Sequence, residues 1–502
     1  MSTTPNTGKF GMSAETVSKT SSITAKMILN GERVDAVSGT VFEVRNPATG
    51  EVVGTAPRAG REDVRRALEI ARRGKPVMAG LPAHRRSAIL GKTAELIGQE
   101  LEQLSQLLTR ENGKTIRQCR FEMATTQRLF ADFAEEAKRI RGHYLPMDNV
   151  PGLEHMISLT LRQPAGIVVG IIPFNYPAEL FAHKIPGAIA AGCSVVVKVP
   201  ELCPLTVLRL GELMLQAGLP PEGMQMLTGF PQDLGDELLT DPDVRVISFT
   251  GSVAAAKTIA VKASTALKRF SFELGGIDAM IVLKDADLNE AANAVVQGRL
   301  TNGAGQICCA VKRVLVQEPV YDRFLDLLVE LAKRIRMGDP TSEETDLGPL
   351  ITPEAAERVD TQVRKSIAMG AKCVFGGERV GRSFYRPTIL VDVTPDMPVL
   401  QEEVFGPVAP VMPFREAEDA VRITNDCSFG LQASVFTKNI HDAIRLAHQL
   451  EVGGVVINAS SAFRPGNVPF GGFKQSGIGR ESITETILEM TELKTIVINE
   501  AI

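Results

Sequence analysis

The sequence predicts an α/β fold, and two patterns predict it. Short continuous apolar runs rich in Val and Ile occur at residues 166–172, 194–197 and 244–249, separated by segments of helix length. Such runs are typical of parallel strands that are buried on both faces in βαβ units. A second alternation of the same kind runs through residues 279–458. We therefore expect two helix-covered sheets, with ligands bound at the carboxyl ends of the strands.

The elements on either side of these strands follow from other patterns. In residues 61–108 apolar side chains recur at steps of three and four, which predicts helices. The second alternation contains strand-like runs and one helix-like segment at 321–336. Segments 156–161 and 493–498 alternate like exposed strands and have no obvious place in either sheet. Strands of this kind suggest an arm that pairs with a neighbouring subunit.

Length, composition and charge narrow the class of protein. At 502 residues the chain is too long for a single core, and 44% hydrophobic with 23% charged residues is ordinary for a soluble globular protein. A net charge of −4 without a long basic run argues against a nucleic-acid or anionic-membrane partner. No apolar run is long enough to span a bilayer.

The cysteines and the N-terminal segment bear on the compartment. Seven cysteines without a CxxC pair argue against a disulfide framework and a structural zinc site, so we expect no metal. Residues 1–26 are rich in Ser and Thr and lack the apolar core of a secretory signal, so we expect a flexible tail. A reducing, cytoplasmic location is expected.

Neither common nucleotide fingerprint is present. There is no GxGxxG, and Gly113-Lys114-Thr115 is not a P-loop, because Leu108 stands where its first glycine belongs. Phe249-Thr250-Gly251-Ser252 ends a strand and opens a helix, where the backbone can approach a pyrophosphate, although such a glycine can also serve only the turn. Lys198 and Glu201 follow another strand. They are either a surface ion pair or a clamp on a ribose, the carboxylate favouring a free 2′-hydroxyl.

Two residues suggest covalent chemistry. Cys308 lies in Gly305-Gln306-Ile307-Cys308-Cys309, and Glu273 precedes a glycine pair in Glu273-Leu274-Gly275-Gly276. A thiol and a carboxylate can supply the nucleophile and the base of an acyl-transfer cycle. Each also fits a structural role, because a buried cysteine is usually a small hydrophobe and such a glutamate often lies in a solvated turn.

Together with these two segments, a set of motifs in fixed order resembles the NAD(P)-dependent aldehyde dehydrogenase superfamily over residues 27–498. The other motifs are Pro173-Phe174-Asn175-Tyr176-Pro177, Lys198 to Glu201, Phe249 to Ser252, Glu403-Val404-Phe405-Gly406-Pro407 and Pro469-Phe470-Gly471-Gly472-Phe473-Lys474-Gln475-Ser476-Gly477. The resemblance implies a Rossmann-type nucleotide-binding domain at 27–142 and 163–275 and an α/β catalytic domain at 276–480. It also implies a small β oligomerisation arm at 143–162 and 481–502, and a homodimer or homotetramer.

The resemblance also implies roles for individual residues. Cys308 would be the nucleophile, because it lies two residues after Gln306, and Cys309 would be a packing neighbour. Glu273 would be the general base and Asn175 an oxyanion donor. The cofactor, NAD or also NADP, would contact Ile172, Pro173, Phe174, Lys198, Glu201, Gly251, Ser252, Leu274, Glu403 and Phe405. Lys198 and Glu201 would hold the adenosine ribose, Gly251 and Ser252 the pyrophosphate, and Glu403 with Phe405 the nicotinamide ribose and ring.

The implied reaction converts an aldehyde to a carboxylic acid. An aldehyde has no leaving group, so a hydride departs only after a nucleophile such as a thiolate has made the carbon tetrahedral. Glu273 favours hydrolysis of the resulting thioester, and the alternatives are a coenzyme A-acylating relative or a structural relative without catalysis. Two departures from the family pattern, Ala256 in place of a second glycine and Phe174 in place of Trp, remove no reacting group.

The substrate is suggested only by residues near the implied entrance. Arg464 precedes the Pro469 motif on a loop that lines the entrance in similar enzymes, and a guanidinium there suits anionic or polar aldehydes such as semialdehydes, lactaldehyde or phosphonoacetaldehyde. It could equally face solvent. Glu179 and His183 share a helix face and either line the entrance or pair locally. Tyr176 and Phe470 are assigned to the same entrance.

Overall fold

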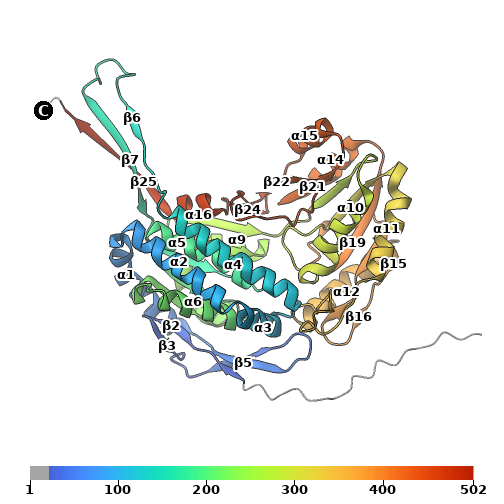
Figure 1. Cartoon of the computed structure of the whole chain (residues 1–502), viewed down its shortest axis with the longest axis horizontal. Coiled ribbons are helices and arrows are strands. Elements are labelled where there is room, and N and C mark those ends of the chain that lie inside the picture. The colour runs from blue at the N-terminus through green and yellow to red at the C-terminus, as the bar shows by residue number, and fades with distance from the viewer. Residues whose placement is uncertain (1–21, 501–502) are drawn as a thin grey trace, which may run out of the picture.

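Two large sheets organise the chain, one in each of two lobes, and a narrow arm projects from the first lobe (Figure 1). The computed structural model describes residues 22–500, so most of the tail expected at 1–26 lies outside the described residues. Among the residues that it describes, no helix is long and apolar enough to cross a membrane. The predicted α/β class is confirmed.

The first lobe is built on an eight-stranded sheet in the order β24-β12-β11-β8-β9-β10-β2-β3. The five strands from β12 to β10 are parallel. Their β-branched side chains are buried on both faces, as the sequence pattern predicts. The strands are β2 (Met27–Leu29), β3 (Glu32–Val34), β8 (Ile167–Ile171), β9 (Ser194–Lys198), β10 (Met224–Leu227), β11 (Val244–Gly251), β12 (Arg269–Leu274) and β24 (Gly477–Ile478).

Helices surround this sheet. Prolines begin α5 and α6, where the missing N–H and the fixed φ suit the first helical turn. The apolar stripe predicted over residues 61–108 is confirmed as the buried faces of α1 to α3. The helices are α1 (Arg61–Gly80), α2 (Ala83–Gln99), α3 (Leu101–Asn112), α4 (Ile116–Glu136), α5 (Pro177–Ala191), α6 (Pro204–Gln216), α7 (Pro231–Leu234), α8 (Glu237–Thr240), α9 (Val253–Ala263) and α16 (Ile483–Glu489).

The second lobe holds a seven-stranded sheet in the order β15-β18-β19-β14-β13-β21-β22. All neighbours except β15 and β18 are parallel. The strands are β13 (Ala279–Val282), β14 (Arg313–Gln317), β15 (Lys372–Phe375), β18 (Thr388–Val391), β19 (Val408–Phe414), β21 (Gln432–Phe436) and β22 (Gly454–Ile457). The helices are α10 (Leu288–Val295), α11 (Tyr321–Lys333), α12 (Pro353–Ala368), α13 (Pro398–Gln401), α14 (Ala417–Asn425) and α15 (Ile440–Gln449).

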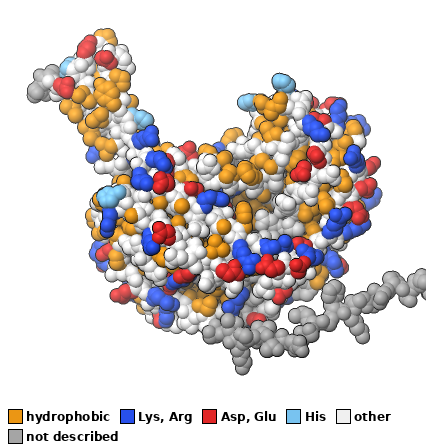
Figure 2. Space-filling view, viewed as in Figure 1, with side chains coloured by type: hydrophobic (Ala, Val, Ile, Leu, Met, Phe, Trp, Pro, Cys, Tyr) orange, Lys and Arg blue, Asp and Glu red, His pale blue; other side chains and the backbone are white. Residues whose placement is uncertain are grey.

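The arm consists of β6 (Tyr144–Pro146), β7 (Met156–Pro164) and β25 (Thr491–Asn499). β25 and β7 pair antiparallel along their whole length. Figure 2 shows apolar side chains along the arm. Of the described residues from 481 on, α16 packs against α4 and α5, and β25 belongs to the arm.

Three small sheets complete the fold. One joins β1 (Ile23–Thr24), β4 (Val41–Arg45) and β5 (Val52–Pro57). The others are two-stranded, β16 (Arg379–Val380) with β17 (Phe384–Tyr385) and β20 (Phe429–Gly430) with β23 (Phe473–Lys474).

Candidate active site

Cys308 follows a left-handed turn that leads from α10 toward β14. Gly303, Ala304 and Gly305 have φ angles of 55°, 52° and 72°. This conformation disfavours a residue with a Cβ by about 1–2 kcal/mol, so Ala304 is strained. Gly305 is also required for space, because an added Cβ would lie 2.3 Å from the carbonyl oxygen of Gly406. The turn leaves Cys308 half-buried and open to two cavities.

The two cavities meet at Cys308. The wide cavity, about 650 Å³, has Asn175, Tyr176, Glu179, Cys308 and Arg464 in its wall. The narrow cavity, about 240 Å³, is lined by Pro173, Phe174, Asn175, Thr250, Gly251, Ser252, Glu273, Leu274, Gly275, Cys308, Glu403 and Phe405. Cys308 and Asn175 line both cavities. Residues from the ends of β8, β11 and β12 therefore meet the Cys308 turn of the second lobe.

The two adjacent thiols differ in their ionisation. The Cys309 thiol donates a hydrogen bond to the Cys308 sulfur, and this lowers the pKa of Cys308 to about 7 although burial opposes ionisation. The positive charges of Arg464 and Lys312 act in the same direction. The hydrogen bond and burial raise the pKa of Cys309 well above its ordinary value. Cys308 is therefore the thiol that ionises near neutral pH, and Cys309 stays protonated.

Glu273 lies in β12 and is only 1% exposed. Neither carboxyl oxygen has a hydrogen-bond partner among the described residues. Burial, followed by the negative charge of Glu481, raises the pKa of Glu273 well above its ordinary value. A buried, unpartnered carboxyl group at the wall of a cavity is typical of a functional site.

Asn175 lies in the loop between β8 and α5 and is 7% exposed. Its side-chain Nδ2 donates a hydrogen bond of 3.1 Å to the carbonyl oxygen of Gln306, two residues before Cys308. The amide is thus tied to the segment that carries the thiol.

The narrow cavity fits a nicotinamide cofactor. Gly251 ends β11 and Ser252 caps α9, so a helix N-terminus opens at its wall. The Oγ1 atom of Thr250 is buried there without a partner among the described residues. At Gly275 an added Cβ would lie 2.1 Å from the Oε2 atom of Glu403, so only glycine lets that carboxylate approach.

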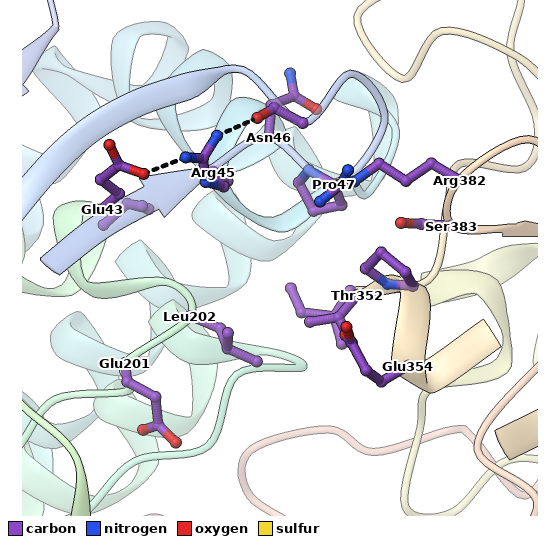
Figure 3. Close-up of a pocket in the computed structure, with 14 residues that line it drawn as sticks. Glu43, Arg45, Asn46, Pro47, Glu201, Leu202, Thr352, Glu354, Arg382 and Ser383 are labelled. Carbon is purple, nitrogen blue, oxygen red and sulfur yellow. Dashed lines mark hydrogen bonds and ion pairs between the residues drawn. The ribbon is translucent and has the colours of Figure 1, made fainter. Parts of the chain in front are cut away.

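Three of the expected cofactor residues lie outside this cavity. Ile172 is buried, and its N–H donates to the carbonyl oxygen of Lys198 (3.1 Å). Lys198 and Glu201 form an ion pair. Glu201 lines a separate cavity of about 200 Å³, and its carboxylate points away from the β4 residues Glu43 and Arg45 across that cavity (Figure 3).

Arg464 does not face solvent. Of the two alternatives left open by the sequence, lining the entrance or facing solvent, the second is therefore excluded. Its side chain is 10% exposed, its Nη2 donates a 2.7 Å hydrogen bond to Glu481, and its guanidinium lies 4.0 Å over the ring of Phe470. Its Nε has no partner among the described residues. Phe470 is buried and supports Arg464 without lining the wide cavity.

Glu179 and His183 show the local pairing. His183 Nε2 lies 3.7 Å from Glu179 Oε1, and only Glu179 reaches the wide cavity. Burial and the charge of Arg464 lower the pKa of His183, so this imidazole is neutral near neutral pH. Tyr176 lines the same cavity, and its hydroxyl donates to Asn302 (2.8 Å).

Several residues at the site were not predicted from the sequence. Lys312 donates to Glu403 (2.8 Å) and to the carbonyl oxygen of Cys308. Glu481 forms a buried ion pair with Lys184, and although burial disfavours its charge, Lys184 and Arg464 lower the pKa of Glu481 to about 2. Arg128, on α4, lines the wide cavity together with Asp132, where burial raises the pKa of Asp132 and the charge of Arg128 opposes that rise. The position of Lys312 four residues after Cys308 was the one available signal.

Comparisons with known proteins agree with this geometry. The model of the aldehyde dehydrogenase family matches residues 34–496. A 3-sulfolactaldehyde dehydrogenase of Priestia aryabhattai is 39% identical, covering 91% of this chain and 95% of that protein. A mitochondrial succinate-semialdehyde dehydrogenase of Arabidopsis thaliana is 38% identical, covering 94% and 89%.

Solved structures give the same result. An NAD-dependent aldehyde dehydrogenase from Sinorhizobium meliloti superposes with a TM-score of 0.92 at 35% identity, covering 95% of each chain. An NADP-dependent enzyme of E. coli also reaches 0.92, at 34% identity and covering 94% of this chain and 98% of that one. A family match over almost the whole chain, together with the two cavities at Cys308, leads to one conclusion: this chain belongs to the aldehyde dehydrogenase family, and it is an oxidoreductase that uses NAD or NADP.

Proposed function

We propose that this enzyme oxidises a small polar or anionic aldehyde to the free carboxylic acid through a thioester on Cys308. The observation that supports this most directly is the position of Cys308 and Asn175 at the junction of the two cavities, with Glu273 in the wall of the narrow one. An aldehyde that enters by the wide cavity meets the thiol at the point where a nicotinamide in the narrow cavity would face it.

The Cys308 thiolate attacks the aldehyde carbon and forms a hemithioacetal. The Cys308 pKa of about 7 provides a large thiolate fraction near neutral pH. The Asn175 amide and the backbone N–H of Cys308 donate to the oxyanion, and the loss of one such donor typically costs about 2.7–4 kcal/mol. A nicotinamide cofactor, when bound, supplies the acceptor for the hydride that leaves this carbon. The carbon is thereby oxidised to a thioester.

Glu273 then activates water for hydrolysis of the thioester. A base with a raised pKa accepts a proton readily but is present as carboxylate only above that pKa, so deacylation is expected to slow as pH falls. Glu273→Gln is expected to retain the first turnover of reduced cofactor and to lose steady-state turnover, measured by stopped-flow absorbance. Unchanged steady-state turnover would show that another group activates the water.

A requirement for coenzyme A distinguishes the acylating alternative from the hydrolytic reaction. If turnover requires coenzyme A, and the product is an acyl thioester instead of the free acid, hydrolysis is not the native branch. Absence of aldehyde oxidation by the wild-type enzyme with either cofactor would favour a structural relative without catalysis.

The wide cavity supports a polar or anionic substrate. Arg128 lies in its wall together with Asp132, and Arg464 keeps one free N–H beside the cavity. A carboxylate or sulfonate could interact with either guanidinium. The similar proteins described above act on 3-sulfolactaldehyde and on succinate semialdehyde. Glu179, in the same wall, opposes an anion.

A panel of anionic and neutral aldehydes, each assayed with NAD and with NADP, tests this proposal. We expect anionic aldehydes to give the higher kcat/KM, and Arg128→Gln to lower it for them while sparing neutral aldehydes. A preference for neutral aliphatic aldehydes would contradict the substrate class. Because Glu201 would repel a 2′-phosphate, NAD is expected to be preferred.

We also infer a homodimer or homotetramer that acts in the cytoplasm. The arm exposes apolar side chains, and β22 forms an open edge of the second sheet. All seven cysteines are free thiols, as suits a reducing compartment.

A further inference from the structure

Asn112, Gly113 and Lys114 form a turn that contacts the loop carrying Asn175. The sequence from Gly113 resembles the end of a P-loop, but the first glycine of that motif is absent. Asn112 Nδ2 donates to the carbonyl oxygen of Phe174 (2.7 Å), and Lys114 Nζ donates to the carbonyl oxygen of Asn175 (2.7 Å). Lys114 Nζ also lies 3.9 Å from the centre of the Tyr176 ring. Two side chains of one turn thus hold three consecutive residues of the loop.

The turn is shaped for this contact. Gly113 ends α3 with a φ of 86°, a left-handed conformation that favours glycine. An added Cβ would also lie 2.8 Å from the ring of Pro349. The chain therefore reverses here so that Asn112 and Lys114, on either side of the glycine, both reach the loop.

Lys114 is paired with a second buried charge. Lys114 and Glu122 form an ion pair and are 4% and 0% exposed. Glu122 Oε1 accepts hydrogen bonds from the N–H groups of Ala178 (3.0 Å) and Glu179 (3.3 Å), in the first turn of α5. The same carboxylate thus caps the helix that follows Asn175 and fixes the lysine that binds the Asn175 carbonyl.

Two buried charges are costly to desolvate, and such pairs are weak evidence for stability alone. Here their contacts converge on one short segment, residues 174–179, and its centre is the amide proposed to bind the oxyanion. An amide contributes only if it is held close to the position that the oxyanion will occupy.

We propose that Lys114 and Glu122 are positioning residues that orient the Asn175 amide for oxyanion binding. This inference rests on the proposed function of Asn175. A shift of the loop by about 1 Å can reduce the rate of the chemical step by about 100-fold. Because Phe174, Tyr176 and Glu179 of the same segment line the two cavities, the rate is compared at saturating aldehyde and NAD, where changes in the substrate KM and the cofactor Kd do not contribute.

A double-mutant cycle tests the inference. The first turnover of reduced cofactor is measured by stopped flow at saturating aldehyde and NAD for wild type, Asn175→Ala, Lys114→Met with Glu122→Gln, and the combination of all three substitutions. Removing both charges together avoids leaving one of them buried and unpaired. We expect the paired substitution to slow the first turnover by about 10- to 100-fold in the wild-type background, and to cause no further loss in the Asn175→Ala background.

The matched control is Glu111→Gln. Glu111 is a second buried carboxylate, and it caps α6 through the N–H groups of Leu205 and Thr206, each at 2.8 Å, without contacting the Asn175 loop. We expect this substitution to lower the melting temperature and to leave the first turnover unchanged.

The outcomes separate the two proposals. Additive losses in the cycle, or a folded paired variant with wild-type first turnover, would overturn the positioning role. If Asn175→Ala alone leaves the first turnover unchanged, the oxyanion role itself fails. If the paired variant does not fold, the single substitution Glu122→Gln, which leaves the Lys114 contact with Asn175 available, enters the cycle in its place under the same expectation of non-additivity.

Discussion

The thiols of Cys308 and Cys309 are neighbours in the chain, and the hydrogen bond between them lowers the pKa of Cys308 and raises that of Cys309. In the proposed reaction the thiolate of Cys308 attacks, and it is present above the pKa of about 7. A hydrogen bond to a charged group contributes about 1.5–3 kcal/mol, equivalent to about one to two pKa units. Cys309 therefore affects the ionisation of Cys308, and it also lines the wide cavity.

Cys309→Ala is expected to raise the pKa of Cys308 from about 7 toward the ordinary range of a thiol. Because the thiolate fraction at neutral pH falls, kcat/KM should fall there and recover at alkaline pH. The measurement is the pH profile of kcat/KM, with Cys427→Ala, a half-buried thiol remote from the cavities, as the control. An unshifted acidic limb would mean that Arg464 and Lys312 set the Cys308 pKa without Cys309.

Individual residues divide into those that motifs predict and those that they do not. The sequence predicted that Cys308, Glu273 and Asn175 act together, and all three line the narrow cavity; their joint action stays a prediction. The sequence did not decide whether Arg464 faces solvent or substrate, because its partner Glu481 lies on a different segment. The Lys184 and Glu481 pair is 297 positions apart in the chain, so no local pattern indicates it.

At the scale of elements, the left-handed turn at residues 303–305 determines where Cys308 lies. Gly305→Ala is expected to destabilise the protein by about 1–3 kcal/mol, because alanine disfavours this backbone conformation, and the clash with the Gly406 carbonyl adds to it. The displaced thiol should also slow the first turnover. Urea unfolding and stopped-flow absorbance measure the two effects.

Ala304→Gly tests the same turn from the opposite direction. Glycine relieves about 1–2 kcal/mol of left-handed strain but loses about 0.4–1 kcal/mol through the entropy of the unfolded chain. We expect stability to be unchanged or raised by up to about 1.6 kcal/mol. In Ala131→Gly, on the exposed face of α4, the same substitution should destabilise by about 1 kcal/mol. Equal losses at both sites would contradict the strain at Ala304.

The helices and strands were largely predictable from the sequence, but the elements that each of them packs against were not. Runs of β-branched residues specified the buried strands β8, β9 and β11, because such runs suit a sheet covered on both faces. The apolar periodicity of α4 specifies one buried face but not the helix that it packs against. The contribution of α4 and of the turn before it to the Asn175 loop therefore emerged only from the structure.

At the scale of the whole molecule, the two lobes bring strand ends from one sheet against the thiol of the other. Neither lobe alone contains the candidate site, since Asn175 and Glu273 belong to the first and Cys308 and Glu403 to the second. The sequence predicted two α/β units, but the way they face each other depends on contacts between remote segments. One example is Arg117, on α4, which binds Asp346 of the second lobe (2.7 Å).

The arm has no second layer of its own. A three-stranded ribbon is stable when one face packs on a core, yet β25 exposes apolar side chains on both faces, with Val497 52% and Ile496 39% exposed. We therefore expect a second copy of the chain to cover it.

Val497→Asp should place an unpaired charge in that interface, which costs about 3–5 kcal/mol and weakens association more than about 100-fold. Size-exclusion chromatography with light scattering over a dilution series measures this. Val41→Asp, at a site that is 53% exposed on β4 of the small three-stranded sheet, should leave the assembly intact. If Val497→Asp assembles like wild type, or if the wild-type chain is monomeric, the arm is not the contact between subunits.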